Sequence, residues 1–107
     1  VLDMGIGNCD EDADTMNEVI FCTGRPEKYR AATETWLNYH YGEPISGRQL
    51  YMRKDGDYRP DDIVKEEILN TNIDKDRVFF VLDDRQQVVD MWRRNGIRCF
   101  QVAEGNF

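Results

Sequence analysis

The sequence has few of the residues that build disulfide frameworks, zinc sites or membrane segments. It contains three cysteines in 107 residues, and Cys9, Cys22 and Cys99 share no CxxC or Cys/His spacing. An odd number of widely separated cysteines predicts free thiols in a reducing, cytosolic setting. No apolar run approaches the roughly 18 residues of a membrane helix, and the N-terminus shows no signal-peptide pattern. We therefore expect a cytoplasmic protein without a membrane span, and a zinc site is not predicted.

Positive charge is absent from the first part of the chain. Residues 1–24 contain six acids and no Lys or Arg, whereas the whole chain has 21 acids and 14 bases. The net charge of −7 is therefore mostly an N-terminal property, and the remaining residues are nearly balanced. Such a balance does not predict the basic stripe that binding to an extended duplex requires. It is compatible with binding of a single phosphate at the end of a nucleic-acid strand.

From Glu18 onward, strand patterns and helix patterns alternate. Strands are predicted over residues 18–23, 49–53, 77–83 and 97–103, with helices that begin near Pro26 and Pro60 and a third helix that ends before Gly96. We expect Gly42 to end the first helix and Ile63 to face inward on the second. This order predicts one α/β domain over residues 1–107, with a three-layer, Rossmann-like parallel sheet and helices on its faces.

The N-terminal connection is short for that architecture. Residues 1–3 have the pattern of a strand end, but only residues 4–17 separate them from the next strand. A parallel crossover takes a dozen residues or more and usually includes a helix, whereas this stretch contains glycines and lacks helical periodicity. We therefore expect a segment to be absent between Asp3 and Glu18.

An apolar run over residues 78–82 ends in two adjacent acids, Asp83 and Asp84. The run predicts a strand that is buried on both faces, as in a parallel sheet. Ligands of such sheets bind beyond the carboxyl ends of the strands, and Mg²⁺ takes one or two carboxylates together with water and phosphate. The alternative is that both acids cap the following helix.

Further polar residues follow another predicted strand or begin a helix. Thr23, Gly24 and Arg25 follow an apolar run, and Asp61 and Lys65 stand one helical turn apart. The plain alternatives are a turn with an N-cap and an exposed helical salt bridge. Phosphoryl transfer needs a nucleophile, ligands for phosphate oxygens, a fixed cation and acids for a metal. The common position of these residues at one edge of the sheet favours that chemistry.

The aromatic residues give only a weak indication of where the core and any interface lie. We expect Trp36 and Trp92 to lie in the core or in an interface, and Tyr39, Tyr41 and Tyr51 leave a homo-oligomer open.

Four features occur along the chain in the order of the haloacid dehalogenase-like (HAD-like) phosphohydrolases, which the chain resembles. They are residues 1–3, Thr23-Gly24-Arg25, Lys65 on a helix, and Leu82-Asp83-Asp84. More narrowly, three stretches are similar to the 3′-phosphatase domain of phage polynucleotide kinase-phosphatases: residues 59–68, 82–94 and 99–107. The resemblance covers roughly residues 18–107, and residues 8–12 are similar to a short segment between the first two motifs of that domain.

This resemblance implies a Mg²⁺-dependent phosphomonoesterase that removes 3′-phosphates from RNA or DNA ends through an aspartyl-phosphate. It also implies that the parent chain could contain a kinase domain. The implied roles are Asp3 as nucleophile and metal ligand; Thr23, Gly24 and Arg25 as phosphate ligands; Lys65 as the bridging cation that Asp61 orients; and Asp83 and Asp84 as metal ligands.

The first motif departs from the family pattern Asp-x-Asp-Gly-Thr. Gly5 stands where the second acid, the general acid-base, is expected, and no Gly-Thr follows it. The loss of general acid-base help typically lowers a rate by about 10²–10⁴-fold. Two other functions therefore stay open: a catalytically impaired end-binding module, and a phosphatase of free nucleotides or other small phosphomonoesters.

Overall fold

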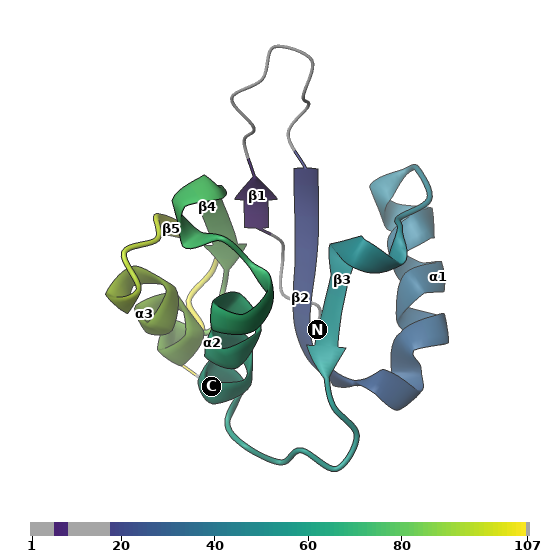
Figure 1. The fold of residues 1–107 in the computed structure, drawn as a ribbon, viewed down its shortest axis with the longest axis horizontal. Coiled ribbons are helices and arrows are strands. Elements are labelled where there is room, and N and C mark those ends of the chain that lie inside the picture. The colour runs from purple at the N-terminus through teal and green to yellow at the C-terminus, as the bar shows by residue number, and fades with distance from the viewer. Residues whose placement is uncertain (1–5, 9–17, 107) are drawn as a thin grey trace.

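The computed structural model describes residues 6–8 and 18–106. Its strands are β1 (Ile6–Asn8), β2 (Glu18–Pro26), β3 (Leu50–Arg53), β4 (Val78–Asp83) and β5 (Cys99–Gln101). Its α-helices are α1 (Arg30–Tyr41), α2 (Asp61–Asn72) and α3 (Gln86–Arg94), with short 3-10 turns η1 (Glu27–Tyr29), η2 (Gly47–Gln49) and η3 (Lys75–Arg77). Figure 1 shows their arrangement. The elements expected from residue 18 onward are confirmed, with ends that shift by a few residues.

The strands form one sheet in the order β3-β2-β1-β4-β5. β2 runs parallel to β3, and β4 runs parallel to β5. β1 is antiparallel to both of its neighbours, β2 and β4, so these two neighbours point the same way. The predicted α/β class is confirmed, but the prediction of a fully parallel sheet is wrong for β1. Residues 9–17 are too few for a crossover, and the chain therefore reverses between β1 and β2.

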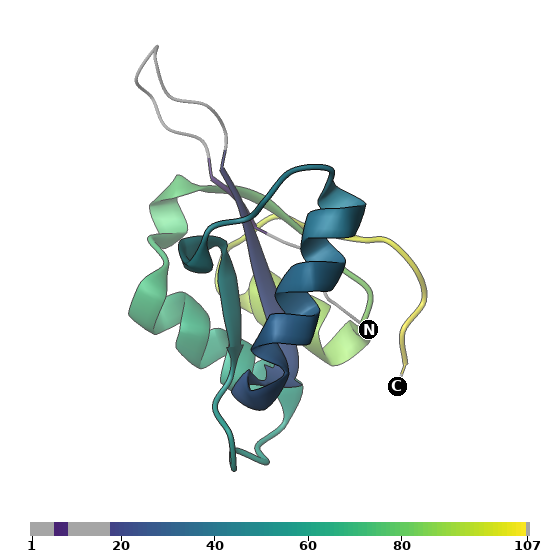
Figure 2. The same ribbon diagram turned by 90° about the vertical axis from the view of Figure 1, so that its right-hand side faces the viewer.

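Helices cover the sheet from both sides, so the predicted three-layer arrangement is confirmed (Figures 1 and 2). α2 and α3 pack on one face through a cluster that includes Leu69, Val81 and Trp92, all fully buried. α1 packs on the other face through a second cluster that includes Phe21, Leu37 and Leu50. The apolar side chains of β2 divide between the two clusters, as the alternation of side chains along a strand requires.

β4 is not buried on both faces, contrary to the prediction. Val81 and Asp83 are buried, whereas Phe79 is 59 % exposed and Phe80 and Leu82 are half-buried. The cluster beneath α1 contains residues of β2 and β3 but none of β4. Among the described residues, no helix covers the second face of β4, which explains the exposure.

One further sequence prediction of burial is wrong. Ile63 was expected to face inward but is 42 % exposed, and the buried face of α2 instead contains Val64 and Lys65 together with residues 68 and 69. Trp36 is 48 % exposed on α1 and therefore does not lie in the core, and the alternative of an interface stays a prediction. Trp92 is fully buried in the core. In the part of the chain that the structure describes, no helix has the length and apolarity to cross a bilayer.

The described cysteines are free, as predicted, and both are buried. Cys22 lies in β2 and Cys99 in β5. Burial raises the pKa of the Cys99 thiol to about 11, with the Asp83 carboxylate adding to the effect, and burial raises the pKa of Cys22 further still. Both thiols are therefore protonated at neutral pH and act as core residues. Cys9 lies outside the described residues.

Candidate functional site

The carboxyl ends of β2 and β4 meet the first turn of α2 at one edge of the sheet, the lower edge in Figure 1. Thr23 and Gly24 lie near the end of β2, Asp83 is the last residue of β4, and Asp61 is the first residue of α2. Contacts among Gly24, Asp61, Lys65 and Asp83 confirm that these four residues converge as predicted. Asp3, the predicted nucleophile, lies outside the described residues.

Gly24 lets the end of β2 approach α2 closely. A Cβ atom built on Gly24 would lie 2.0 Å from Oδ1 of Asp61 and 2.8 Å from its Cγ. No larger residue fits unless Asp61 moves, so a close approach, rather than a special backbone angle, requires glycine here. The alternative of a turn with an N-cap is wrong, because Thr23 and Gly24 lie within β2 and no side chain caps the following η1 turn. The buried Thr23 hydroxyl instead accepts a hydrogen bond from the Arg25 amide at 3.2 Å.

Lys65 is fully buried between two carboxylates. Its Nζ lies 3.9 Å from Oδ2 of Asp61 and 3.8 Å from Oδ2 of Asp83. Desolvation lowers the pKa of Lys65 to about 8; the Asp83 and Asp84 charges oppose this shift and Arg85 adds to it. Lys65 thus stays mostly protonated at neutral pH. The alternative of an exposed salt bridge between Asp61 and Lys65 is wrong, because packing encloses both side chains.

Asp83 is held in one orientation by three donors. Its Oδ1 accepts the amides of Asp84 at 2.8 Å and Arg85 at 3.3 Å, and its Oδ2 accepts the indole Nε1–H of Trp92 at 3.1 Å. These amides belong to the turn before α3, whose N-cap is Arg85, and the Arg85 side chain makes no cap bond. Asp83 therefore stabilises the entry to α3 rather than capping its first turn. The sequence predicted that Trp92 is buried, but not that it orients this carboxylate.

Arg53 is a site residue that the sequence analysis missed. Its Nε donates to the Gly24 carbonyl at 2.8 Å, and its Nη2 donates to Oδ1 of Asp61 at 2.8 Å. Its Nη1 donates to the carbonyls of Asp57 and Arg59. One planar guanidinium thus fastens the end of β2, the loop before α2 and the first residue of α2 together. The only local indication was an arginine at the end of a weak strand pattern.

Asp61 also forms an ion pair with a second arginine, Arg85. Arg85 Nη1 lies 3.3 Å from Oδ2 of Asp61, so Asp61 contacts three cationic side chains, those of Arg53, Lys65 and Arg85. The Asp61 carboxylate is only 12 % exposed. The role of Arg85 was not predicted either. Arg25, the predicted phosphate ligand, has its guanidinium 5.5 Å from the centre of the Tyr29 ring.

The acids at the end of β4 fit the requirements of Mg²⁺. Asp84 is half-buried, and its carboxylate makes no hydrogen bond or ion pair with another described residue. No group of three or more His, Cys, Asp or Glu side chains suited to a metal occurs within residues 6–8 and 18–106. Mg²⁺ needs only one or two protein carboxylates because water and phosphate supply its other ligands. Asp83 and Asp84 are the two carboxylates at the end of β4 that could hold such an ion.

Comparison with known proteins places this arrangement in a family. A family model described as the polynucleotide kinase PNKP phosphatase domain matches residues 6–107. The chain belongs to this family. The match extends from β1 to the C-terminal segment and includes every described site residue, and it confirms the resemblance to a polynucleotide kinase-phosphatase. The α/β architecture with parallel strands is compatible with the HAD-like fold.

Two solved structures are similar to this PNKP phosphatase domain. One is a structure of the Pnkp1/Rnl/Hen1 RNA repair complex, with 41 % sequence identity and a TM-score of 0.68 over 80 % of this chain. The other is a structure of the Pnkp1/Rnl/Hen1 complex, with 42 % identity and a TM-score of 0.71 over 80 % of this chain. The PNKP phosphatase domain described here spans only 27 % and 30 % of those two chains.

Proposed function

We propose that this domain is a Mg²⁺-dependent phosphatase that removes the 3′-phosphate from RNA ends. The observation that carries the proposal is the buried Lys65 ammonium between Asp61 and Asp83, directly beside the end of β2. A fixed cation in a water-poor site stabilises the charge of a transferring phosphoryl group. RNA is favoured over DNA because one of the two similar solved structures is described as an RNA repair complex.

The site residues divide into a phosphate-binding part and a metal-binding part. The phosphoryl oxygens would lie at the end of β2, where Thr23, Gly24 and Arg25 offer a hydroxyl, backbone amides and a guanidinium. Asp83 and Asp84 would hold Mg²⁺, which supplies neutralisation and orientation of the phosphate charge when it is bound.

The reaction would proceed in two displacements. A carboxylate oxygen of the nucleophile, assigned to Asp3 from the sequence, attacks phosphorus, and the bond between phosphorus and the ribose 3′-oxygen breaks. The 3′-oxygen keeps the electron pair and takes up a proton. Water then attacks the phosphorus of the aspartyl-phosphate, which restores the carboxylate and releases inorganic phosphate. Lys65 keeps its positive charge through both steps.

The test is phosphate release from a 3′-phosphorylated RNA oligonucleotide, measured with Mg²⁺ and after chelation by EDTA. We expect Lys65→Met and Asp83→Ala to abolish release, and Lys75→Met to leave it unchanged. Lys75 is a suitable control because it lies in η3, which precedes β4 at the opposite end of that strand.

Matched substrates separate the competing functions. Faster release from the RNA oligonucleotide than from its DNA counterpart or a 3′-mononucleotide supports the proposal. A preference for the mononucleotide indicates a phosphatase of small phosphomonoesters. Tight Mg²⁺-dependent binding of the 3′-phosphate end without any release indicates an end-binding module, and either result contradicts the proposal.

A further inference from the structure

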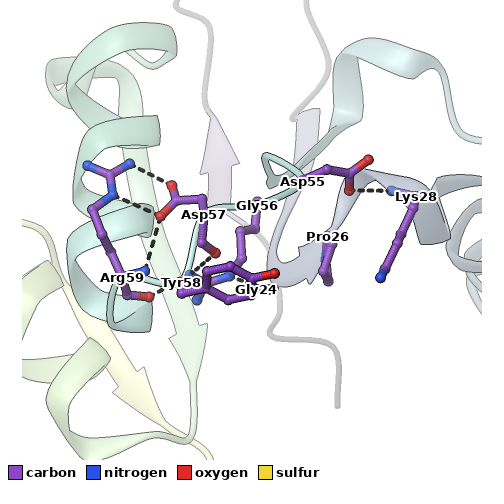
Figure 3. A pocket seen from close by; sticks show the side chains of 9 residues that line it. Gly24, Pro26, Lys28, Asp55, Gly56, Asp57, Tyr58 and Arg59 are labelled. Carbon is purple, nitrogen blue, oxygen red and sulfur yellow. Dashed lines mark hydrogen bonds and ion pairs between the residues drawn. The ribbon is translucent and has the colours of Figure 1, made fainter.

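A cavity of about 320 Å³ adjoins the site at the end of β2. It is lined by Gly24, Pro26, Lys28, Arg53 and residues 55–59. Figure 3 shows Lys28 on the side that leads to α1, and Asp57 and Arg59 on the side of α2. The cavity thus lies between the connection from β2 to α1 and the loop from β3 to α2.

This cavity shares two residues with the phosphatase site. Gly24 and Arg53 line it, and both also meet Asp61, which pairs with Lys65. A phosphate bound at the end of β2 would therefore have the cavity as its neighbour. Ligand cavities commonly measure about 300–1,000 Å³. The observed volume is at the lower end of that range and suits one nucleoside.

The cavity carries an aromatic ring that the described protein leaves uncovered. Tyr58 lies in the loop before α2 and is 94 % exposed. A ring face that is open to solvent offers a stacking surface for a nucleic-acid base of any sequence. The loop is anchored to η1 by the Lys28 amide, which donates to Oδ1 of Asp55 at 2.9 Å. The Tyr58 ring therefore lies on a loop that this hydrogen bond holds against η1.

The charges of the cavity favour one further phosphate rather than several. The Lys28 ammonium lies 5.3 Å from the centre of the Tyr29 ring and pairs with no carboxylate of a described residue. An ammonium of this kind is a suitable point-charge ligand for a phosphodiester. Asp57 is neutralised by Arg59 at 2.7 Å, whereas Asp55 faces the cavity with a backbone amide as its donor. An extended polyanion is disfavoured by that carboxylate.

We propose that this cavity binds the 3′-terminal nucleoside of a single-stranded substrate. Tyr58 stacks on its base, and Lys28 binds the phosphodiester on its 5′ side. The inference rests on the proposed function, because it assumes that the terminal phosphate lies at the end of β2. It assigns recognition of the strand end to residues outside the catalytic group.

The first test compares a 3′-phosphorylated RNA oligonucleotide with p-nitrophenyl phosphate, which has no nucleoside. For Tyr58→Ala we expect a roughly 5- to 10-fold lower kcat/KM on the oligonucleotide, mainly through KM, because an exposed ring gives the low end of the stacking contribution. Turnover of p-nitrophenyl phosphate should be unchanged, and Tyr58→Phe should restore oligonucleotide turnover. Tyr39→Ala is the matched control, since Tyr39 is 80 % exposed on α1.

Equal losses on both substrates, or no loss on either, would overturn the inference. A second measurement keeps it testable if the protein releases no phosphate at all, which is the failure of the proposed function. Fluorescence anisotropy of a labelled 3′-phosphorylated tetranucleotide should then show about 5- to 10-fold weaker binding for Tyr58→Ala and for Lys28→Ala. Unchanged affinity in both variants would refute the cavity as a nucleoside site.

Discussion

Replacing Gly24 with alanine puts a methyl group where the Asp61 carboxylate already lies. The new Cβ would be 2.0 Å from Oδ1 of Asp61, so that oxygen must move by more than an ångström to reach ordinary contact. An aspartate side chain can rotate, but here its oxygens are bound to Arg53 at 2.8 Å and to Arg85 at 3.3 Å. Movement of Asp61 therefore breaks partly buried charged hydrogen bonds.

The structure sets the size of the effect. A partly buried hydrogen bond to a charged group contributes about 1.5–3 kcal/mol, and inserting an extra methyl group into packed structure costs about 1–3 kcal/mol. We expect Gly24→Ala to lower the free energy of unfolding by about 3 kcal/mol. We also expect kcat/KM for phosphate release to fall about 100-fold, because displacement by an ångström near reacting groups has costs of that order.

The assay is urea unfolding combined with phosphate release, and Gly47→Ala is the control. A Cβ on Gly47 meets no atom within 4 Å, and Gly47 does not have a positive φ. Alanine there restricts the unfolded chain, which stabilises a protein by about 0.4–1 kcal/mol when the native backbone is compatible. The two substitutions should therefore change stability in opposite directions.

A double-mutant cycle tests the stated cause. In an Asp61→Ala background the atoms that the new methyl group would meet are gone, so Gly24→Ala should cost no stability there. If Gly24→Ala is as destabilising in that background as in the natural chain, the steric explanation is wrong. Full activity of Gly24→Ala would refute the functional part of the reasoning.

Three further predictions follow from buried contacts. Trp92→Phe removes an indole bond to a buried carboxylate and should lower unfolding free energy by about 2 kcal/mol, whereas exposed Trp36→Phe should change it by less than about 0.5 kcal/mol in urea titrations. Folding lowers the pKa of Lys65 from 10.5 to about 8, so the unfolded chain binds more protons than the folded chain between these two pH values. The free energy of unfolding should therefore rise from about pH 8 to 10.5, and Lys65→Met should lack this rise. Phosphate release should fall above pH 8 as the ammonium is lost. Arg53→Lys should lower kcat/KM about 10- to 100-fold, because one ammonium does not reproduce the guanidinium bonds, and Arg48→Lys should leave it within about 2-fold.

Local features of the sequence predicted most elements from residue 18 onward. The helices end where expected, with Gly42 at φ 87° and Gly96 at φ 80°, because glycine adopts this conformation with little strain. Neither the position nor the direction of β1 was predicted, since residues 6–8 lie in a stretch without a strand pattern and the direction depends on which strands lie beside it. The exposure of Phe79 and Ile63 was also missed, because periodicity identifies a face but not what covers it.

The candidate site was predictable in its members and not in its internal contacts. Thr23, Asp61, Lys65 and Asp83 stood out because each follows a strand or begins a helix, and such positions converge in a parallel sheet. Arg53 was missed because its partners lie in β2, in the loop before α2 and in α2 itself, and no local spacing records that arrangement.

The sequence by itself determined the order of strands and helices and the residues that lie at their ends, because hydrophobic periodicity and helix-ending residues act over a few positions. Only the tertiary structure decided that Lys65 is buried with a lowered pKa, that Arg53 joins β2 to α2 and the loop before it, and that a cavity lies beside Gly24. Those properties arise from desolvation and contact between segments far apart in the chain, and such distances exist only once the layers have packed.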